Sequence, residues 1–278
     1  MAMTMFMAPL FGQGKNKNKD LLSEEDLIAY SARIENDWRF GATEVMWLED
    51  ERTFNNYYET VPLRCPDELE EVLHWSTRSY NENLMILRLE KQIYGKPGSK
   101  KCEANLVKYF KDPEKAKEKF AKAHSYAAMY EKMAKEFPAI IEGMRNRTYN
   151  IPQGDLVYFE FHSGGGMVRR PPIHLELNRQ KDGSYIALLD TEEFDKYDTL
   201  AVTKAQVDEI RQLLIDGEVY KMPRYYDTPV MLLDAPSHHV SVGFTDGSYS
   251  CNSYPPEEWG GKNIGAVCKC LRSLQAKD

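Results

Sequence analysis

Residues 155–178, DLVYFEFHSGGGMVRRPPIHLELN, decide the fold because apolar and polar side chains alternate in two runs within them. In the first run Val157, Phe159 and Phe161 are separated by single residues, and a second run of the same kind begins at Ile173. A period of two is typical of a β-strand with one buried face and one solvated face. The stretch therefore predicts two antiparallel strands, joined by the glycine-rich segment between them.

Three consecutive glycines at 164–166 raise the question of a phosphate-binding loop. Such a loop leads into a helix, whose first backbone amides and partial positive charge converge on the phosphate. Here Pro171 and Pro172 prevent a helix from continuing, and neither a Gly-Lys-Ser/Thr sequence nor the dinucleotide fingerprint is present. The sequence therefore favours a permissive turn between two strands over a nucleotide site.

Pairing of Phe161 with Leu175 on the buried face would bring four polar side chains together on the other face. These form two cross-strand pairs, His162 with His174 and Glu160 with Glu176. Two carboxylates directly opposite each other repel unless a proton or a cation lies between them. Histidines and glutamates on rigid strands could therefore hold a divalent metal such as zinc.

The competing interpretation is that these four residues only form the solvated face of an antiparallel sheet, with the strand register shifted by two. No characteristic ligand spacing such as His-Glu-x-x-His supports the metal site. His238 and His239 offer no second cluster, because neighbours on a strand point to opposite faces. The sequence identifies no catalytic residue and predicts no cofactor other than this candidate metal.

The sequence before residue 151 is mainly helical in pattern. Ser23, followed by acidic residues, predicts a capped helix over 24–36. Residues 38–63 are rich in aromatics without a clean period, and we expect a mixture of strand and loop there.

Two longer helices follow. One is expected over 66–93, with Pro66 in its first turn, and the other begins at Asp112, with Pro113 behind it. The second carries an apolar seam over 120–144 in steps of three and four. We expect the two helices to form an intramolecular hairpin, and a dimerising coiled coil through the seam is the alternative.

After the first two strands, Asp182-Gly183 is expected to turn the chain into a further strand that begins at Ser184. The acidic segment 190–198 lacks the glycine of a calcium loop and has Phe194 where an oxygen ligand is needed, so we interpret it as a solvated approach to the next helix. It leads to a helix that begins with a capping box at Thr203 and ends near Gly217.

A hairpin with Asp246-Gly247 as its two-residue turn would place Phe244 opposite Tyr249. A last helix is expected at about 262–274. Hairpins with interspersed helices and no regular strand-helix-strand repeat predict an α+β protein. We expect an N-terminal long-helix hairpin region followed by an antiparallel sheet with two covering helices.

Three parts are expected along the chain: residues 1–20, a mainly helical region at 21–150, and an α+β domain at 151–278. The first part contains an apolar run that is too short to span a bilayer and ends in a small-x-small pattern. We interpret it as the remnant of a signal peptide followed by a polar spacer. This interpretation predicts an extracytoplasmic protein, either periplasmic or secreted.

The five cysteines are too few for a disulfide-built scaffold: they are Cys65, Cys102, Cys251, Cys268 and Cys270. A straight helix over 66–93 is about 40 Å long, whereas the eight residues after it reach less than about 30 Å. Cys65 and Cys102 should therefore not be bonded to each other.

The composition limits the function classes. The 278 residues carry a formal net charge of -7, which argues against nucleic acid as a partner. We expect a non-catalytic binding or interaction module for an unknown protein or small-molecule ligand, without a membrane span, as a monomer or homodimer. Two alternatives stay open: a metal-dependent hydrolase with its site on the exposed face of the 156–178 hairpin, and a structural homodimer through the 120–144 seam.

Overall fold

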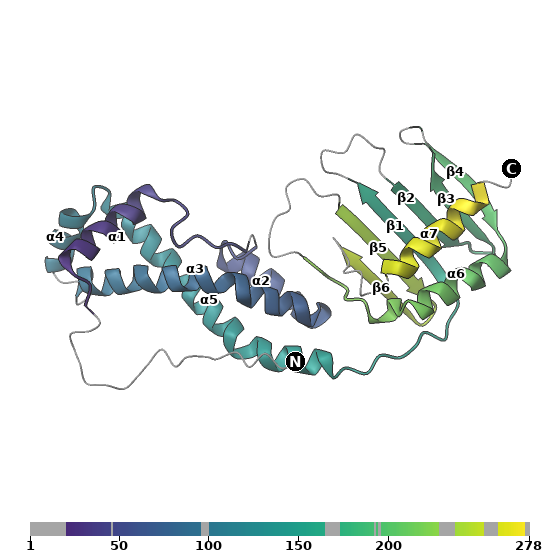
Figure 1. Cartoon of the computed structure of the whole chain (residues 1–278), viewed down its shortest axis with the longest axis horizontal. Helices are drawn as coiled ribbons and strands as arrows, with labels where there is room; N and C mark the ends of the chain where they lie inside the picture. Colours follow the sequence, from purple (N-terminus) through teal and green to yellow (C-terminus); the bar gives the residue numbers. More distant parts are fainter. Residues whose placement is uncertain are drawn as a thin grey trace. The chain divides into compact units, whose positions relative to one another are not determined.

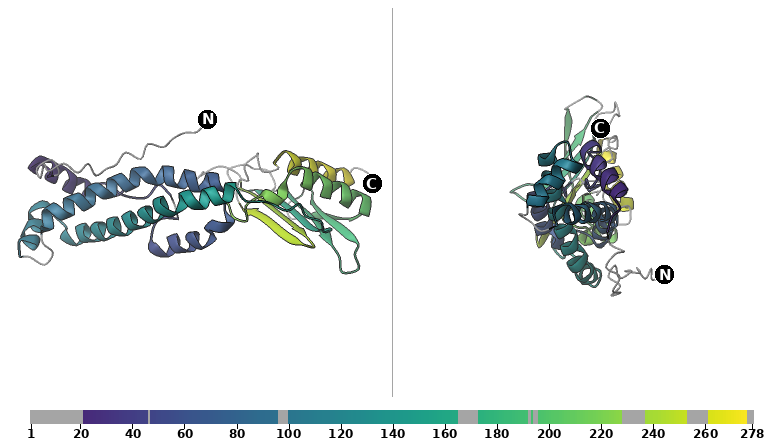
Figure 2. Two further views of the ribbon diagram at one scale, coloured as in Figure 1. Left: turned by 90° about the horizontal axis from the view of Figure 1, so that it is seen from below. Right: turned by 90° about the vertical axis from the view of Figure 1, so that its left-hand side faces the viewer.

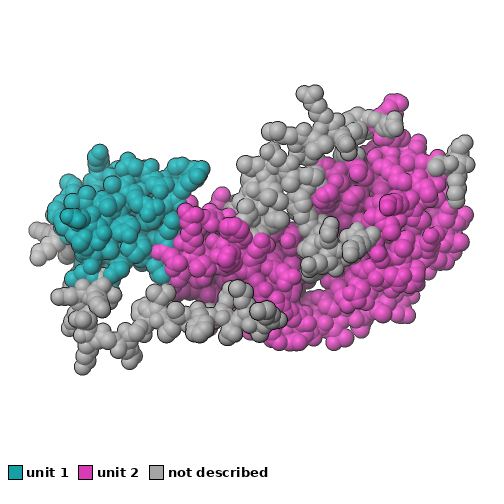
Figure 3. Space-filling view, in the orientation of Figure 1, with its two compact units in different colours: residues 1–41, 82–124 teal, residues 42–81, 125–278 magenta. Residues whose placement is uncertain are grey.

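The computed structural model describes residues 21–45, 47–95, 100–164, 173–191, 193, 196–227, 237–252 and 261–275. The expected signal-peptide remnant and most of the glycine-rich turn lie outside this part of the chain. The chain divides into two compact units, residues 1–41 with 82–124 and residues 42–81 with 125–278 (Figure 3). We describe each unit by itself.

Four helices provide the structure of the first unit: α1 (Glu24–Asn36), α4 (Lys100–Tyr109), and parts of α3 (Pro66–Tyr94) and α5 (Pro113–Arg145). The prediction for α1 is confirmed, and Ser23 forms a capping box with Asp26. The sequence interpretation missed α4. Cys102, Leu106 and Phe110, which follows the helix, are buried and lie four residues apart. This is a helical spacing, but the run is too short to be recognised in the sequence.

The second unit begins with α2 (Glu51–Thr60) and a short 3-10 helix, η1 (Val61–Leu63). The expectation of strand and loop over 38–63 is therefore wrong for residues 51–63, whereas the described residues before Glu51 form loops and turns as expected. Asp50 and Thr53 form a capping box at the start of α2, and Phe54 and Tyr57 are buried three residues apart on one helix face. The helical period is present, but the additional aromatic residues around it obscure the pattern.

The intramolecular helical hairpin is confirmed separately in each unit. In the first unit the ring of Tyr94 meets Phe120 edge to face, with ring centroids 5.7 Å apart. In the second unit Tyr80 and Tyr130 stack with centroids 4.1 Å apart, and the Tyr126 hydroxyl donates to a carbonyl of α3. Most of the seam side chains are buried in the cores of the chain itself: Phe120, Ala123, Ala127, Phe137, Ile141 and Met144.

The rest of the second unit contains a six-stranded sheet in the order β4-β3-β2-β1-β5-β6, in which all neighbouring strands are antiparallel. This confirms the α+β fold class. The strands are β1 (Leu156–Gly164), β2 (Ile173–Arg179), β3 (Tyr185–Asp190), β4 (Tyr197–Val202), β5 (Ser237–Phe244) and β6 (Gly247–Asn252).

Two helices, α6 (Lys204–Asp216) and α7 (Gly261–Gln275), cover one face of this sheet (Figure 1, Figure 2). Thr203 and Gln206 form the capping box that the sequence predicts at the start of α6. Buried side chains of both helices, including Val207 and Val267, share one core with Phe159 of β1. The opposite face of the sheet, which we call the open face, carries the polar side chains of the strands.

Three local expectations about the strands need correction. The supposed acidic loop 190–198 ends in an edge strand, β4, which begins at residue 197 and whose side chains are mostly exposed and so lack a clear alternation. A bulge between Leu156 and Tyr158 turns Leu156 fully inward, so that Val157 is only half-buried.

The third correction concerns the last hairpin. Phe244 pairs with Gly247 rather than with Tyr249, so that Thr245 and Asp246 form the turn. The Asp246 carboxylate accepts hydrogen bonds from the backbone amides of Gln153 and Gly154. These bonds from a distant segment stabilise a turn that the sequence of the hairpin alone does not predict.

The cysteine prediction is confirmed, because Cys65 and Cys102 are both free thiols in the structure. Cys268 and Cys270 are free as well. None of the described helices combines the length and the apolar composition that crossing a bilayer requires.

Candidate functional site: the open face of the sheet

Three histidines lie side by side on the open face, on the adjacent strands β2, β1 and β5. His162 on β1 pairs with His174 on β2 and, on its other side, with His239 on β5. The first of these pairs is the one expected from the sequence. The ring of His174 is held by edge-to-face contacts, at centroid distances of 5.8 Å from His162 and 5.5 Å from Tyr197.

A row of carboxylates runs beside the histidines. Glu160 on β1 pairs with Glu176 on β2, as the sequence predicts, and with Ser241 on β5. The predicted register of the first hairpin is therefore confirmed without a shift. Because residues two apart on a strand share a face, the glutamate row and the histidine row are neighbours on one surface.

The two rows converge at one point. One ligand atom each of Glu160, His174 and Glu176 lies within 4.8 Å of the other two. The His174 Nε2 atom is 2.5 Å from Glu176 Oε1, and the Asn178 amide donates to Glu176 Oε2 at 2.9 Å. His162 belongs to the histidine row, but it is not a member of this converging group.

The converging side chains are half-buried. Exposed fractions are 20% for His174 and 28% for Glu176, against 36% for Glu160. In the described part of the chain, neither glutamate forms an ion pair with a lysine or an arginine. The two carboxylates thus face each other without a lysine or arginine partner among the described residues, and a cation would relieve their repulsion.

His239 is the member of the site that the sequence interpretation missed. The expectation that His238 and His239 point to opposite faces is consistent with the structure, in which His238 stacks on Phe161 with centroids 6.2 Å apart. However, His239 alone reaches the open face, where its Nε2 atom is 4.0 Å from Glu160 Oε2. No local signal could reveal this, because β5 pairs with β1 across more than 70 residues of chain.

The floor beside the site is shaped by a glycine. A Cβ atom at Gly243 would lie 2.1 Å from Cε1 of Tyr158, so the tyrosine ring lies directly over this residue. The Tyr158 hydroxyl is 3.5 Å from the Oγ atom of Ser241, at the end of the carboxylate row. The open face thus continues from the charged rows to the ring of Tyr158.

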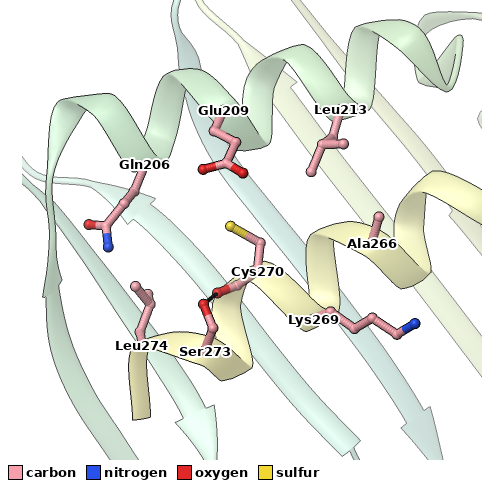
Figure 4. Close-up of a pocket in the computed structure, with 8 residues that line it drawn as sticks. All are labelled: Gln206, Glu209, Leu213, Ala266, Lys269, Cys270, Ser273 and Leu274. Atoms are coloured by element: carbon pink, nitrogen blue, oxygen red, sulfur yellow. Dashed lines mark hydrogen bonds between the residues drawn. The ribbon is translucent and has the colours of Figure 1, made fainter. Parts of the chain in front are cut away.

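A separate groove of about 430 Å³ lies between α6 and α7 (Figure 4). Its lining residues are Gln206, Glu209, Leu213, Ala266, Lys269, Cys270, Ser273 and Leu274. The Ser273 hydroxyl inside it donates to the Cys270 carbonyl. The groove contains a single carboxylate and no histidine, so it offers no set of metal ligands comparable with that of the open face.

A second electrostatic cluster is buried where η1 meets α3. The Arg64 guanidinium donates to Glu68 Oε1 at 2.7 Å and to Asp227 Oδ2 at 2.8 Å, and it lies 3.9 Å from the centroid of the Tyr57 ring. The Tyr57 hydroxyl donates to the same Glu68 oxygen. Burial raises the pKa of Glu68 to about 7, although the attraction of Arg64 opposes this change. Among the charged residues of this cluster only Glu68 and Arg64 are buried, and a single buried acid beside a single buried base is typical of a structural ion pair.

No protein-family model matches the chain, and no curated protein sequence matches it. Imidazole and carboxylate groups together are ligands that zinc and its neighbours in the first transition row accept, whereas calcium and magnesium prefer oxygen alone.

Proposed function

We propose that the protein is a non-catalytic binding module that holds a divalent transition-metal ion on the open face of its sheet. The observation that carries this proposal is the convergence of Glu160, His174 and Glu176 within 4.8 Å. The three residues come from two strands in the middle of a six-stranded sheet, so the backbone holds them in place.

The spacing suits a metal ion of small radius. With metal–ligand bonds of about 2.1 Å, the ligand atoms of a tetrahedral site lie about 3.4 Å apart. The ligand atoms of Glu160, His174 and Glu176 lie within 4.8 Å of one another, so the widest pair would approach by up to about 1.4 Å. His174 Nε2 and Glu176 Oε1, which are 2.5 Å apart, would separate by about 0.9 Å. Rotation of the side chains covers changes of this size. Binding thus requires no movement of the strands.

Metal titration of the purified, tag-free chain tests the proposal. After treatment with a chelator, the wild type should bind one Zn²⁺ or Co²⁺ per chain in isothermal titration calorimetry. Glu176→Gln keeps the shape of the side chain but removes its charge, so we expect at least tenfold weaker binding. Glu209→Gln on α6 is the matched control, because it removes an equivalent charge away from the open face.

Two outcomes would overturn the proposal. Either the wild type shows no saturable uptake of any first-row divalent ion, or Glu176→Gln binds as tightly as Glu209→Gln does. Circular dichroism of both variants would show that they are folded, so that a loss of binding reports on the site.

A metal-dependent hydrolase is the second candidate. It is supported by the same three-ligand group, because three protein ligands leave a coordination position for a water molecule that the ion activates. The zinc-loaded wild type should then hydrolyse an activated ester or phosphate ester, and Glu176→Gln should not. Equal background rates in both proteins would leave the binding module as the better interpretation.

The homodimer alternative has no comparable support. The seam side chains over 120–144 are largely buried in the cores of the chain itself, so they are occupied within one molecule. Localisation outside the cytoplasm remains a proposal that rests only on the composition of residues 1–20.

A further inference from the structure

We infer that His239 is the fourth ligand of this metal site and closes it with two imidazole nitrogens and two carboxylate oxygens. The inference rests on the proposed metal-binding function and goes further, because it names the complete ligand set. It also separates the two candidate functions, since a closed four-ligand site leaves no position for a reactive water.

The position of His239 in the sheet supports this role. β5 pairs with β1 in a register that places His239 beside His162, one row away from Glu160. Diagonal neighbours of this kind are within reach of long side chains. The His239 Nε2 atom is 4.0 Å from Glu160 Oε2. His239 lies outside the group of three converging ligands, so its side chain would rotate toward the ion on binding.

The direct partner of Glu160 on β5 is Ser241, a small residue that is 9% exposed. Glu160 is the residue that joins the two sides of the site, with His174 on one side and His239 on the other.

His162 has a different role. It lies between the other two histidines in the row, but among the described residues it forms no ion pair with Glu160 or Glu176, whereas His239 lies 4.0 Å from Glu160. Its ring meets the His174 ring edge to face at 5.8 Å. We therefore assign His162 as a positioning residue that restricts the orientation of the His174 imidazole.

The ion in such a site would connect the three central strands. Glu160, His174 and Glu176 belong to the hairpin of β1 and β2, whereas His239 belongs to β5. The exposed fractions of 32% for His239 and 36% for Glu160 leave the ion a path from solvent. A metal bound in this way would stabilise the sheet by binding only to its folded form.

Cobalt spectroscopy of His239 and His238 variants tests the inference. Four-coordinate Co²⁺ absorbs visible light strongly, whereas Co²⁺ with additional water ligands absorbs weakly. The wild type should show the strong absorption. His239→Ala should still bind Co²⁺ through the remaining three ligands, with at least tenfold lower affinity and with weak absorption.

His238→Ala is the matched control, because it removes a histidine from the same strand on the opposite face. It should retain the affinity and the spectrum of the wild type. His239→Asn provides a second variant that is close in shape to histidine, and it should behave as His239→Ala does.

The outcomes distinguish this inference from the proposed function. If the wild type binds Co²⁺ and the His239 variants are unchanged in both affinity and spectrum, the fourth ligand is wrongly assigned and the metal site stands. Equal losses in His238→Ala and His239→Ala would show a general effect on β5 and would also overturn the assignment. If the wild type binds no metal, both the proposed function and the inference fail.

Discussion

Replacing the buried Glu68 with glutamine should change how protein stability depends on pH. The Glu68 side chain is fully buried, and its Oε2 atom has no hydrogen-bond partner among the described residues. Only Oε1 is engaged, by the Arg64 guanidinium at 2.7 Å and the Tyr57 hydroxyl at 2.9 Å. Desolvation therefore outweighs the attraction of Arg64 and raises the pKa of Glu68 from its ordinary 4.5 to about 7.

The sign and the size of the effect follow from this change in pKa. Between the two values the folded chain holds a proton that the unfolded chain has released. Protonated Glu68 therefore contributes fully to the free energy of unfolding below about pH 4.5, and this contribution is lost as the pH rises through about 7. The difference between these pKa values corresponds to about 3 kcal/mol, of which about 2.5 kcal/mol falls between about pH 5 and about pH 8.

Urea unfolding of the wild type and of Glu68→Gln at several pH values measures this contribution. Trp47 stacks on Tyr57 with ring centroids 3.4 Å apart, so its fluorescence reports on the neighbourhood of Glu68. The free energy of unfolding of the wild type, relative to the variant, should fall by about 2.5 kcal/mol from about pH 5 to about pH 8.

Glu70→Gln is the matched control, because Glu70 also pairs with an arginine of the chain, Arg145 at 2.9 Å, but its side chain is 48% exposed. Its unfolding free energy should follow that of the wild type across the whole range. A constant difference between the wild type and Glu68→Gln would refute the reasoning, since it would mean that pairing with Arg64 keeps Glu68 ionised in the fold.

Three smaller predictions concern stability and can be measured by chemical or thermal unfolding. Gly243→Ala should cost about 1–3 kcal/mol, because its Cβ atom would lie 2.1 Å from the Tyr158 ring; unchanged stability would show that the ring moves freely. Gly265→Ala in α7 should instead stabilise the protein by about 0.5–1 kcal/mol, since no heavy atom lies within 4 Å of the new Cβ atom, and a loss of stability would contradict this. Thr203→Ala should cost about 1 kcal/mol, because it removes the acceptor for the Gln206 amide at the start of α6, whereas Thr203→Ser should retain most of the stability.

The sequence predicts those features that depend on residues close together in the chain. Ser23 and Thr203 mark the starts of α1 and α6 because a capping side chain bonds to amides only two or three residues away. The register of β1 and β2 follows from alternation in both strands, because a slip by one residue would turn Phe161 and Leu175 toward solvent. The pairs of Glu160 with Glu176 and of His162 with His174 could therefore be predicted from the sequence.

Weak local patterns explain the elements that were missed. In α2 the helical spacing of Phe54 and Tyr57 is hidden among other aromatic residues. As an exposed edge strand, β4 has little apolar alternation to detect. In the last hairpin, hydrogen bonds from Gln153 and Gly154 to Asp246 stabilise a turn one residue earlier than the local sequence suggests.

Only the tertiary structure decides which strand lies on the other side of β1. A period of two tells which face of β5 is polar, but it does not tell which strand β5 pairs with or in what register. That pairing depends on the packing of α6 and α7 against the sheet as a whole. The sequence thus determines the first half of the candidate site, and the placement of His239 beside Glu160 follows from long-range packing alone.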